Sequence, residues 1–202
     1  WRISGWHVLM REAQVGGKGD ESGWDVYEES RLVGAIIATA HEHSYHRTHL
    51  LSDISTQEVA DADGEYVISQ GKTLLFVSGL GGRSIRDQER CLPTTPPYGC
   101  NGEWASIYAE QQGAQFGATF LVFGEVGPCQ ARGYFKDIDG VVVDAWLMTS
   151  VVGSCASGCT CASDLDHDCD IDADDFLILT GGWGLYDSSD FFALLADWGA
   201  CL

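Results

Sequence analysis

Short apolar runs alternate with polar, glycine-containing stretches along residues 1–150. Each run has the length of a strand, and most are rich in β-branched and aromatic residues. The stretch Gly23–Leu32 predicts a helix, with Ser22 and Asp25 placed as in a capping box. Asp139-Gly140, between two such runs, predicts a hairpin turn. The predicted strands are Arg2–Leu9, Val33–Thr39, Thr73–Ser78, Ala118–Phe123, Gln130–Lys136 and Val141–Met148.

The order of these elements indicates the fold class. A strand, a helix and a buried strand open the chain, which is typical of α/β folds. The later strands are predicted to be antiparallel, because Asp139-Gly140 joins two of them directly. We therefore expect an α/β sandwich with mixed sheets over residues 1–150.

Residues 164–202 contain an internal repeat with an offset of 15 residues. In both copies Phe, Leu and Trp lie on one face of a short helix, and Asp and Gly stand at its start and end. We expect the two helices to pack through these faces as a small all-α tail. A linker rich in Gly, Ser, Ala and Cys joins it to the main domain at 151–163. The repeated faces are Phe176/Leu179/Trp183 and Phe191/Leu194/Trp198.

The net charge of the chain indicates which classes of partner it can bind. The 202 residues include 11 Lys and Arg against 30 Asp and Glu, for a formal net charge of −19. We expect no nucleic-acid partner, because such binding needs a basic face. No apolar run has the length of a membrane span. The chain opens on Trp1 rather than Met, so we expect a processed or truncated piece of a longer protein.

Six of the eight cysteines lie in the second half of the chain. Their spacing does not match the paired ligands of a zinc ribbon. Disulfides are therefore favoured over reduced, buried thiols, and they imply a secreted or cell-surface protein. Cys91 and Cys100 bracket a proline-rich loop and are predicted to close it, whereas the other pairings stay open.

Four histidines fall within residues 41–49, directly after the apolar run Val33–Thr39. α/β sheets place their sites at the carboxyl ends of strands. Imidazole is a ligand for Zn, Fe and Mn, and a His-x-His pair such as His41 and His43 can face two adjacent ions. His7 lies near the end of another predicted strand and can face the same site. Surface histidines without a common geometry are the alternative.

Residues 40–47, Ala-His-Glu-His-Ser-Tyr-His-Arg, resemble the Gly-His-x-His-x-Tyr-x-Arg block of calcineurin-like metallophosphoesterases, in particular the purple-acid-phosphatase-like branch. The strand before His7, the glycine-rich turn at 76–82 and the hairpin at Asp139-Gly140 match family segments in the same order, so the resemblance covers about 1–148. It implies that His7, His41 and His43 are ligands of two transition-metal ions (Fe, Zn or Mn). These ions would activate a water that hydrolyses a phosphate ester.

The resemblance also assigns the neighbours of these histidines. Tyr45 and Arg47 match the motif, and we expect them to support the ligands or to be structural. His46 and His49 match no ligand position, so we expect them to be exposed or behind the ligands. The upstream blocks that supply an Asp, a Gly-Asp and a Gly-Asn-His are absent from the sequence. We therefore expect the C-terminal portion of a metallophosphoesterase, inactive by itself.

The tail carries aspartates at the spacing of a calcium loop. Ca²⁺ takes six to eight oxygens, which an EF-hand loop supplies at alternate positions and at its last position. The tail resembles a dockerin type I-like module, and the resemblance implies a protein or cell-surface partner. A solvated acidic run is the alternative. We expect one Ca²⁺ site with Ile171 packed inside the tail and with the ligands Asp164, Asp166, Asp168, Asp170 and Asp175.

Three functions are therefore considered. The first is a fragment of a secreted metallophosphoesterase with a calcium-binding anchoring tail. The second is a non-catalytic, calcium-dependent binding module outside the cell. The third is a structural protein that binds zinc through the histidine cluster. The first is favoured, because the matching segments occur in the family's order over about 148 residues.

Overall fold

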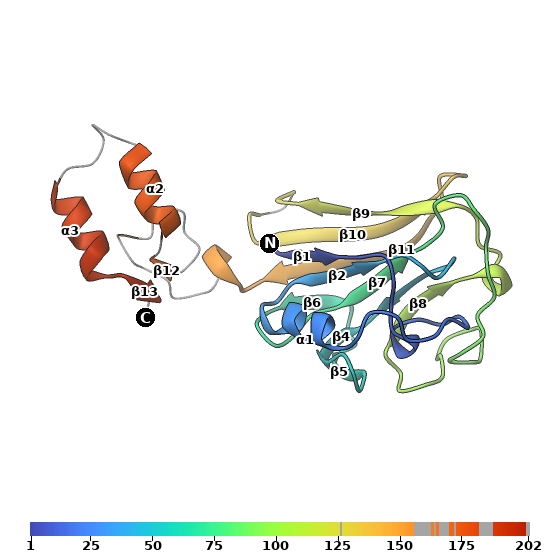
Figure 1. The fold of residues 1–202 in the computed structure, drawn as a ribbon. Coiled ribbons are helices and arrows are strands. Elements are labelled where there is room, and N and C mark those ends of the chain that lie inside the picture. The colour runs from blue at the N-terminus through green and yellow to red at the C-terminus, as the bar shows by residue number, and fades with distance from the viewer. Residues whose placement is uncertain are drawn as a thin grey trace. The chain divides into compact units, whose positions relative to one another are not determined.

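The computed structural model divides the chain into two compact units, Trp1–Ser150 and Val151–Leu202. It describes residues 1–125, 127–155, 163, 165, 170–171, 173–181 and 188–200. The first unit is built on two β-sheets, whereas the second contains two short helices (Figure 1). The expected α/β class with mixed sheets is confirmed.

The first sheet has the strand order β1-β2-β7-β3-β8. β1, β2 and β7 run parallel to one another, whereas β3 pairs antiparallel with both β7 and β8. The helix α1 (Asp25–Leu32) connects β1 to β2 and begins without a side-chain cap, so the predicted capping box at Ser22 is wrong. The strands are β1 Ile3–Gly5, β2 Ile36–Thr39, β7 Leu75–Ser78, β3 Tyr45–Thr48 and β8 Trp104–Tyr108.

Both faces of this sheet are buried, which explains the continuous apolar run in β2. Successive residues of a strand point to opposite faces. Ile36 therefore packs with Phe135 and other residues of the second sheet, in the core between the sheets. Ile37 packs on the other face, in a cluster with Tyr27 of α1.

The second sheet has the order β6-β11-β10-β9. β10 and β11 form the predicted antiparallel hairpin, in which the Gly140 N–H donates to the Asp137 carbonyl at 3.1 Å. Gly140 has a φ of 86°, a conformation that favours glycine. The strands are β6 Glu65–Ile68, β9 Gly117–Phe123, β10 Gln130–Asp137 and β11 Val142–Ser150.

A buried ion pair joins the two sheets. The Arg47 guanidinium on β3 donates through Nε and Nη2 to the two carboxylate oxygens of Asp144 on β11, at 2.7 and 3.0 Å. The Tyr45 hydroxyl donates to the same carboxylate at 2.6 Å. The Trp146 ring lies 4.6 Å from the guanidinium carbon. Tyr45 and Arg47 were expected either to support the metal ligands or to be structural. The contacts with Asp144 are structural, because they join the two sheets.

Smaller elements complete the first unit. The predicted disulfide between Cys91 and Cys100 is confirmed. Cys129 and Cys155 are disulfide-bonded as well, and none of the described cysteines is a free thiol. None of the helices in the described part of the chain combines the length and apolar character needed to span a membrane. The remaining strands form a hairpin of β4 (Leu50–Asp53) and β5 (Glu58–Asp61).

The second unit contains the two helices that the repeat predicts, α2 (Ala173–Gly181) and α3 (Ser188–Ala196). The rings of Phe176 and Phe191 lie 6.0 Å apart, around a core of Ile171, Leu179 and Leu194. Trp198 is half exposed, contrary to its expected place in the packed face, and Trp183 lies outside the described residues. The unit also has a two-residue antiparallel pair, β12 (Asp170–Ile171) with β13 (Gly199–Ala200), which the all-α expectation omitted.

Candidate metal centre

Two of the three predicted ligands are in contact. His7 follows β1, and His41 lies in the turn after β2, so the parallel pairing of these strands brings both residues to one sheet edge. The His41 N–H donates to the His7 carbonyl at 3.0 Å. The ring atoms His41 Nδ1 and His7 Nε2 are 2.9 Å apart. Main chain and side chains therefore join the two histidines at the carboxyl ends of neighbouring strands.

His43, the third predicted ligand, lies at the same turn but faces another partner. Its Nδ1 is 2.5 Å from the Ser84 hydroxyl, and its carbonyl accepts the Arg86 N–H at 3.0 Å. Among the described residues, the one group of three potential ligands within 4.8 Å of one another is Cys91, Cys100 and Glu103, whose sulfurs form the disulfide. The structure thus brings His7 and His41 together and places His43 against the loop after β7.

Gly79 explains how that loop supports the histidine turn. The Gly79 N–H donates to the Ser44 carbonyl at 3.0 Å. A Cβ at this position would lie 1.7 Å from the Glu42 carbonyl oxygen and 2.6 Å from that of Ala40. Any larger residue would therefore displace the main chain that carries His41 and His43.

Glu42, between the two histidines, is a buried carboxylate that was not among the predicted site residues. Its Oε1 accepts the His43 N–H at 3.1 Å, and its Oε2 lies 3.7 Å from Arg86 Nη1. In the described part of the chain, Oε2 is buried without a hydrogen-bond donor. Burial raises the pKa of the carboxyl group, which Arg86 opposes. Its place in the sequence, between the two histidines of the His-x-His pair, was the signal that could have identified it.

The second nitrogen of His41 has two charged neighbours. Its Nε2 lies 2.7 Å from Lys18 Nζ and 3.2 Å from the Glu21 carboxylate. Burial and the Lys18 charge lower the pKa of His41, and burial and the Arg86 charge lower that of His43. Both shifts favour the neutral imidazole, which is the form that binds metal ions.

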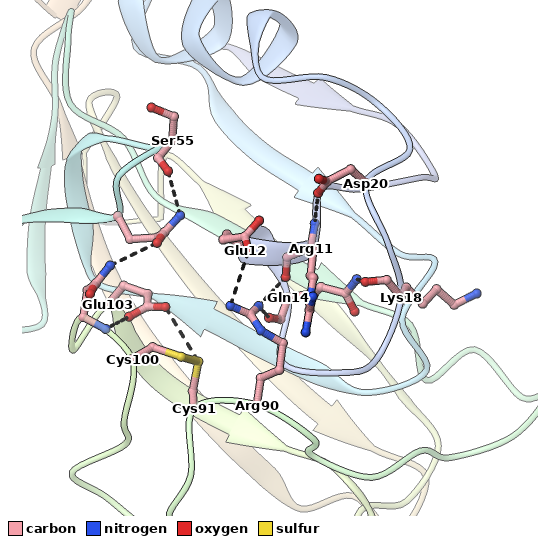
Figure 2. Close-up of polar contacts among 12 residues, drawn as sticks. Arg11, Glu12, Gln14, Lys18, Asp20, Ser55, Arg90, Cys91, Cys100 and Glu103 are labelled. Carbon is pink, nitrogen blue, oxygen red and sulfur yellow. Dashed lines mark hydrogen bonds and ion pairs between the residues drawn. A yellow bond between two sulfur atoms is a disulfide. The ribbon is translucent and has the colours of Figure 1, made fainter.

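Polar contacts fix the segment that carries Lys18 (Figure 2). The Arg11 N–H donates to the Asp20 carboxylate at 2.8 Å, and the Gln14 side-chain amide donates to the Lys18 carbonyl at 2.9 Å. Arg90, from the loop next to the Cys91–Cys100 disulfide, donates to the carbonyls of Arg11 and Gln14. The segment thus has a defined path toward the histidines, although it contains no long helix or strand.

The two remaining histidines of the cluster lie apart from the predicted ligands. His46 is fully buried, with Nδ1 3.1 Å from the Ser44 hydroxyl and its ring edge-on to Trp104. Burial lowers its pKa to about 3. His49 is partly buried, with Nδ1 3.2 Å from the Tyr66 hydroxyl. The expectation of exposure is therefore wrong for His46, because β3 is buried on both faces.

The geometry of His7 and His41 fits one transition-metal ion. Zn–N bonds of about 2.0–2.1 Å in a tetrahedral site separate the ligand nitrogens by roughly 3.3 Å. The two nitrogens, at 2.9 Å, need to move apart by only a few tenths of an ångström. The carboxylates described at this edge, Glu21 and Glu42, already contact His41 and Arg86. A second ion of the predicted pair would therefore need ligands other than these two described carboxylates.

The predicted calcium ligands lie mostly outside the described residues. This applies to Asp164, Asp166 and Asp168, and nothing is described of the side chain of Asp170. Asp175 is fully buried, and its carboxylate accepts the Leu165 N–H at 2.5 Å. The described part of the loop thus folds its last position back onto its second residue.

Comparisons with known proteins give one structural likeness. No protein-family model matches the chain. No curated protein matches it either. The solved structure of a purple acid phosphatase isolated from yellow lupin (Lupinus luteus) seeds is similar, with 17% identity and a TM-score of 0.47. The likeness covers 62% of this chain and 19% of that one, so the chain matches less than a fifth of the phosphatase.

Proposed function

We propose that residues 1–150 are the metal-binding C-terminal portion of a metallophosphoesterase whose complete form hydrolyses phosphate esters. The contact between His7 and His41 at the ends of two parallel strands carries this proposal. Metal ions of the Fe, Zn or Mn class, when bound, lower the pKa of a water and hold phosphate oxygens. In this chain His7 and His41 would hold one ion, with His43 next to them as the ligand toward a second.

The charges at this edge support a phosphate substrate. The chain has a net charge of −19, yet Lys18, Arg83 and Arg86 all act on His43 and lower its pKa, after the effect of burial. The Ser84 hydroxyl lies at the same place. These groups would attract and orient an anion beside the metal ligands.

Zinc titration of the full chain, monitored by calorimetry, tests the metal site. We expect one equivalent to bind and the binding to be lost in the double variant His41→Ala/His43→Ala.

A hydrolysis assay with an aryl phosphate and Zn²⁺, Mn²⁺ or Fe tests the incomplete site. Turnover should fall short of a complete two-metal enzyme by a factor of about a thousand or more, because the clamping of both reacting oxygens is lost. Robust turnover that the double variant abolishes would contradict the incomplete site.

A second proposal concerns residues 164–202. We infer that they bind one Ca²⁺ through Asp164, Asp166, Asp168, Asp170 and Asp175 and anchor the protein to a protein or cell-surface partner. The contact of the buried Asp175 carboxylate with the Leu165 N–H supports this, because it holds the last position of the loop next to its second residue. The Cys91–Cys100 disulfide supports a secreted or cell-surface location. Calcium binding without zinc binding would favour the alternative of a non-catalytic anchoring module.

A further inference from the structure

We propose that Lys18 and Glu21 compete for Nε2 of His41 and thereby determine whether the His7–His41 pair is closed or open to a metal ion. The inference rests on the proposed metal function of this pair. Neither Lys18 nor Glu21 belongs to the His-x-His block, and both reach it from the segment before α1.

Both ring nitrogens of His41 are engaged. Nδ1 lies 2.9 Å from His7 Nε2, while Nε2 lies 2.7 Å from Lys18 Nζ and 3.2 Å from a Glu21 carboxylate oxygen. A neutral imidazole has one N–H and one lone pair. The partner that Nε2 selects therefore decides what Nδ1 presents to His7.

Contact with Lys18 closes the pair. An ammonium group only donates hydrogen bonds, so Nε2 of His41 must accept, and the ring proton resides on Nδ1. That N–H then donates to His7 Nε2 across 2.9 Å. Each histidine uses its facing nitrogen in this internal hydrogen bond, and neither lone pair is available to a metal ion.

Contact with Glu21 opens the pair. A carboxylate accepts, so the ring proton of His41 moves to Nε2 and Nδ1 presents a lone pair to His7. In the Nδ1–H tautomer of His7, the lone pair of its Nε2 faces that of His41 Nδ1. Two facing lone pairs repel each other without a cation and form a ligand pair with one. A carboxylate on the far nitrogen of a ligating imidazole orients the ring and increases its basicity, and losing it typically costs 10–100-fold in metal affinity. Glu21 is thus a positioning residue, and Lys18 opposes it.

The main chain holds both competitors in place. The Glu21 N–H donates to the Leu9 carbonyl at 3.1 Å, and the Lys18 carbonyl accepts the Gln14 side chain. Figure 2 shows the Lys18 side chain extending away from Gln14. Only the side-chain contacts at His41 need to change between the two states.

Zinc titration calorimetry on the full chain and its variants measures the competition. We expect Glu21→Ala to weaken zinc binding by about 10–100-fold and Glu21→Gln, whose amide oxygen still accepts, to fall in between. Lys18→Met should strengthen binding by about tenfold, the effect of one hydrogen bond to a charged group. Glu89→Ala is the control for Glu21→Ala, and Arg83→Gln is the control for Lys18→Met. Each control removes a nearby charge of the same sign that acts on this cluster through space. Each control should change the affinity less than its matched variant.

Nitrogen NMR of the His41 ring in the metal-free protein gives a readout that a merely structural role would not move. We expect Lys18→Met to shift the tautomer from Nδ1–H toward Nε2–H. Zinc binding that Glu21→Ala and Lys18→Met leave equal to their controls would overturn the inference and leave the proposed function standing. A tautomer shift in Lys18→Met, together with no zinc binding by the wild-type chain, would support the competition and overturn the proposed metal function.

Discussion

The neighbouring residues 41–47 have different roles, which depend on the face of β3 to which each side chain points. His41 and His43 precede the strand and stay in the turn at the sheet edge. Tyr45 and Arg47 then point between the sheets toward Asp144, whereas His46 points to the opposite buried face beside Trp104. The spacing of the motif therefore follows the alternating faces of a strand as well as the predicted ligands.

His46 makes stability depend on pH. Its pKa is lowered to about 3 by burial, from an ordinary value near 6.5, so the unfolded chain binds a proton that the folded chain refuses. The contribution of His46 is complete above pH 6.5 and is lost as the pH falls toward 3. Between pH 7 and 5 this amounts to about 2 kcal/mol in the free energy of unfolding. Urea unfolding at a series of pH values measures it.

The variant His46→Gln isolates this effect from the other histidines. Gln does not titrate, so the difference in unfolding free energy between wild type and variant should narrow as the pH is lowered. Nε2 of His46 is buried without a hydrogen-bond partner among the described residues, so a proton there finds no acceptor. Parallel pH profiles for the two proteins would contradict the prediction.

At the scale of residues, the sequence predicted that His7 and His41 lie together, but it did not predict their neighbours Lys18 and Glu21. The contact follows from local information, since each histidine ends a recognisable strand and parallel strands share an edge. Lys18 and Glu21 come from a segment without a regular hydrophobic pattern. Its path depends on Arg90, from a loop far along the chain, and no local signal marks that contact.

At the scale of elements, the turn after β7 acts as a support for the histidine turn. Gly79 approaches the main chain at Glu42 so closely that a Cβ would overlap its carbonyl oxygen at 1.7 Å. Because the obstacle is main chain, it cannot rotate away as a long side chain can. Gly79 of the glycine-rich turn that follows the predicted strand thus has a packing role.

Gly79→Ala should therefore destabilise the first unit by about 1–3 kcal/mol, the usual cost of overpacking. It should also weaken zinc binding, because the displaced carbonyls belong to the turn of His41 and His43. Gly81→Ala is the matched control, since no atom lies within 4 Å of the added Cβ. Urea unfolding and zinc titration of both variants test this, and equal behaviour of the two would contradict the proposed support.

The elements that the sequence predicted are those with strong local signals. The β10–β11 hairpin follows from Asp139-Gly140 and the alternating runs beside it. β3 was missed because Tyr45–Thr48 is polar or aromatic throughout, although all four residues are buried. Its burial depends on the ion pair with Asp144 in the other sheet, a contact 97 residues away in sequence that local patterns do not contain.

At the scale of the whole molecule, composition changes where the structure divides. Residues 161–202 contain ten Asp and no Lys, Arg or Glu, whereas the other acidic residues and every Lys and Arg belong to 1–160. The unit Trp1–Ser150 holds the histidine edge, and the unit Val151–Leu202 holds the aspartate loop. The two proposed metal sites therefore differ in ligand chemistry, nitrogen in one and oxygen in the other, which suit Zn²⁺ and Ca²⁺ respectively.

Differential scanning calorimetry of the full chain tests this division. A ligand that binds only the folded state at 100 times its dissociation constant adds about 2.7 kcal/mol of stability. Zn²⁺ should raise the unfolding temperature of one transition, and His41→Ala should abolish that shift alone. Ca²⁺ should raise the other, and Asp175→Ala should abolish that shift alone, so each variant is the control for the other ion. A calcium shift that survives Asp175→Ala would contradict the loop site, because this buried carboxylate closes the loop.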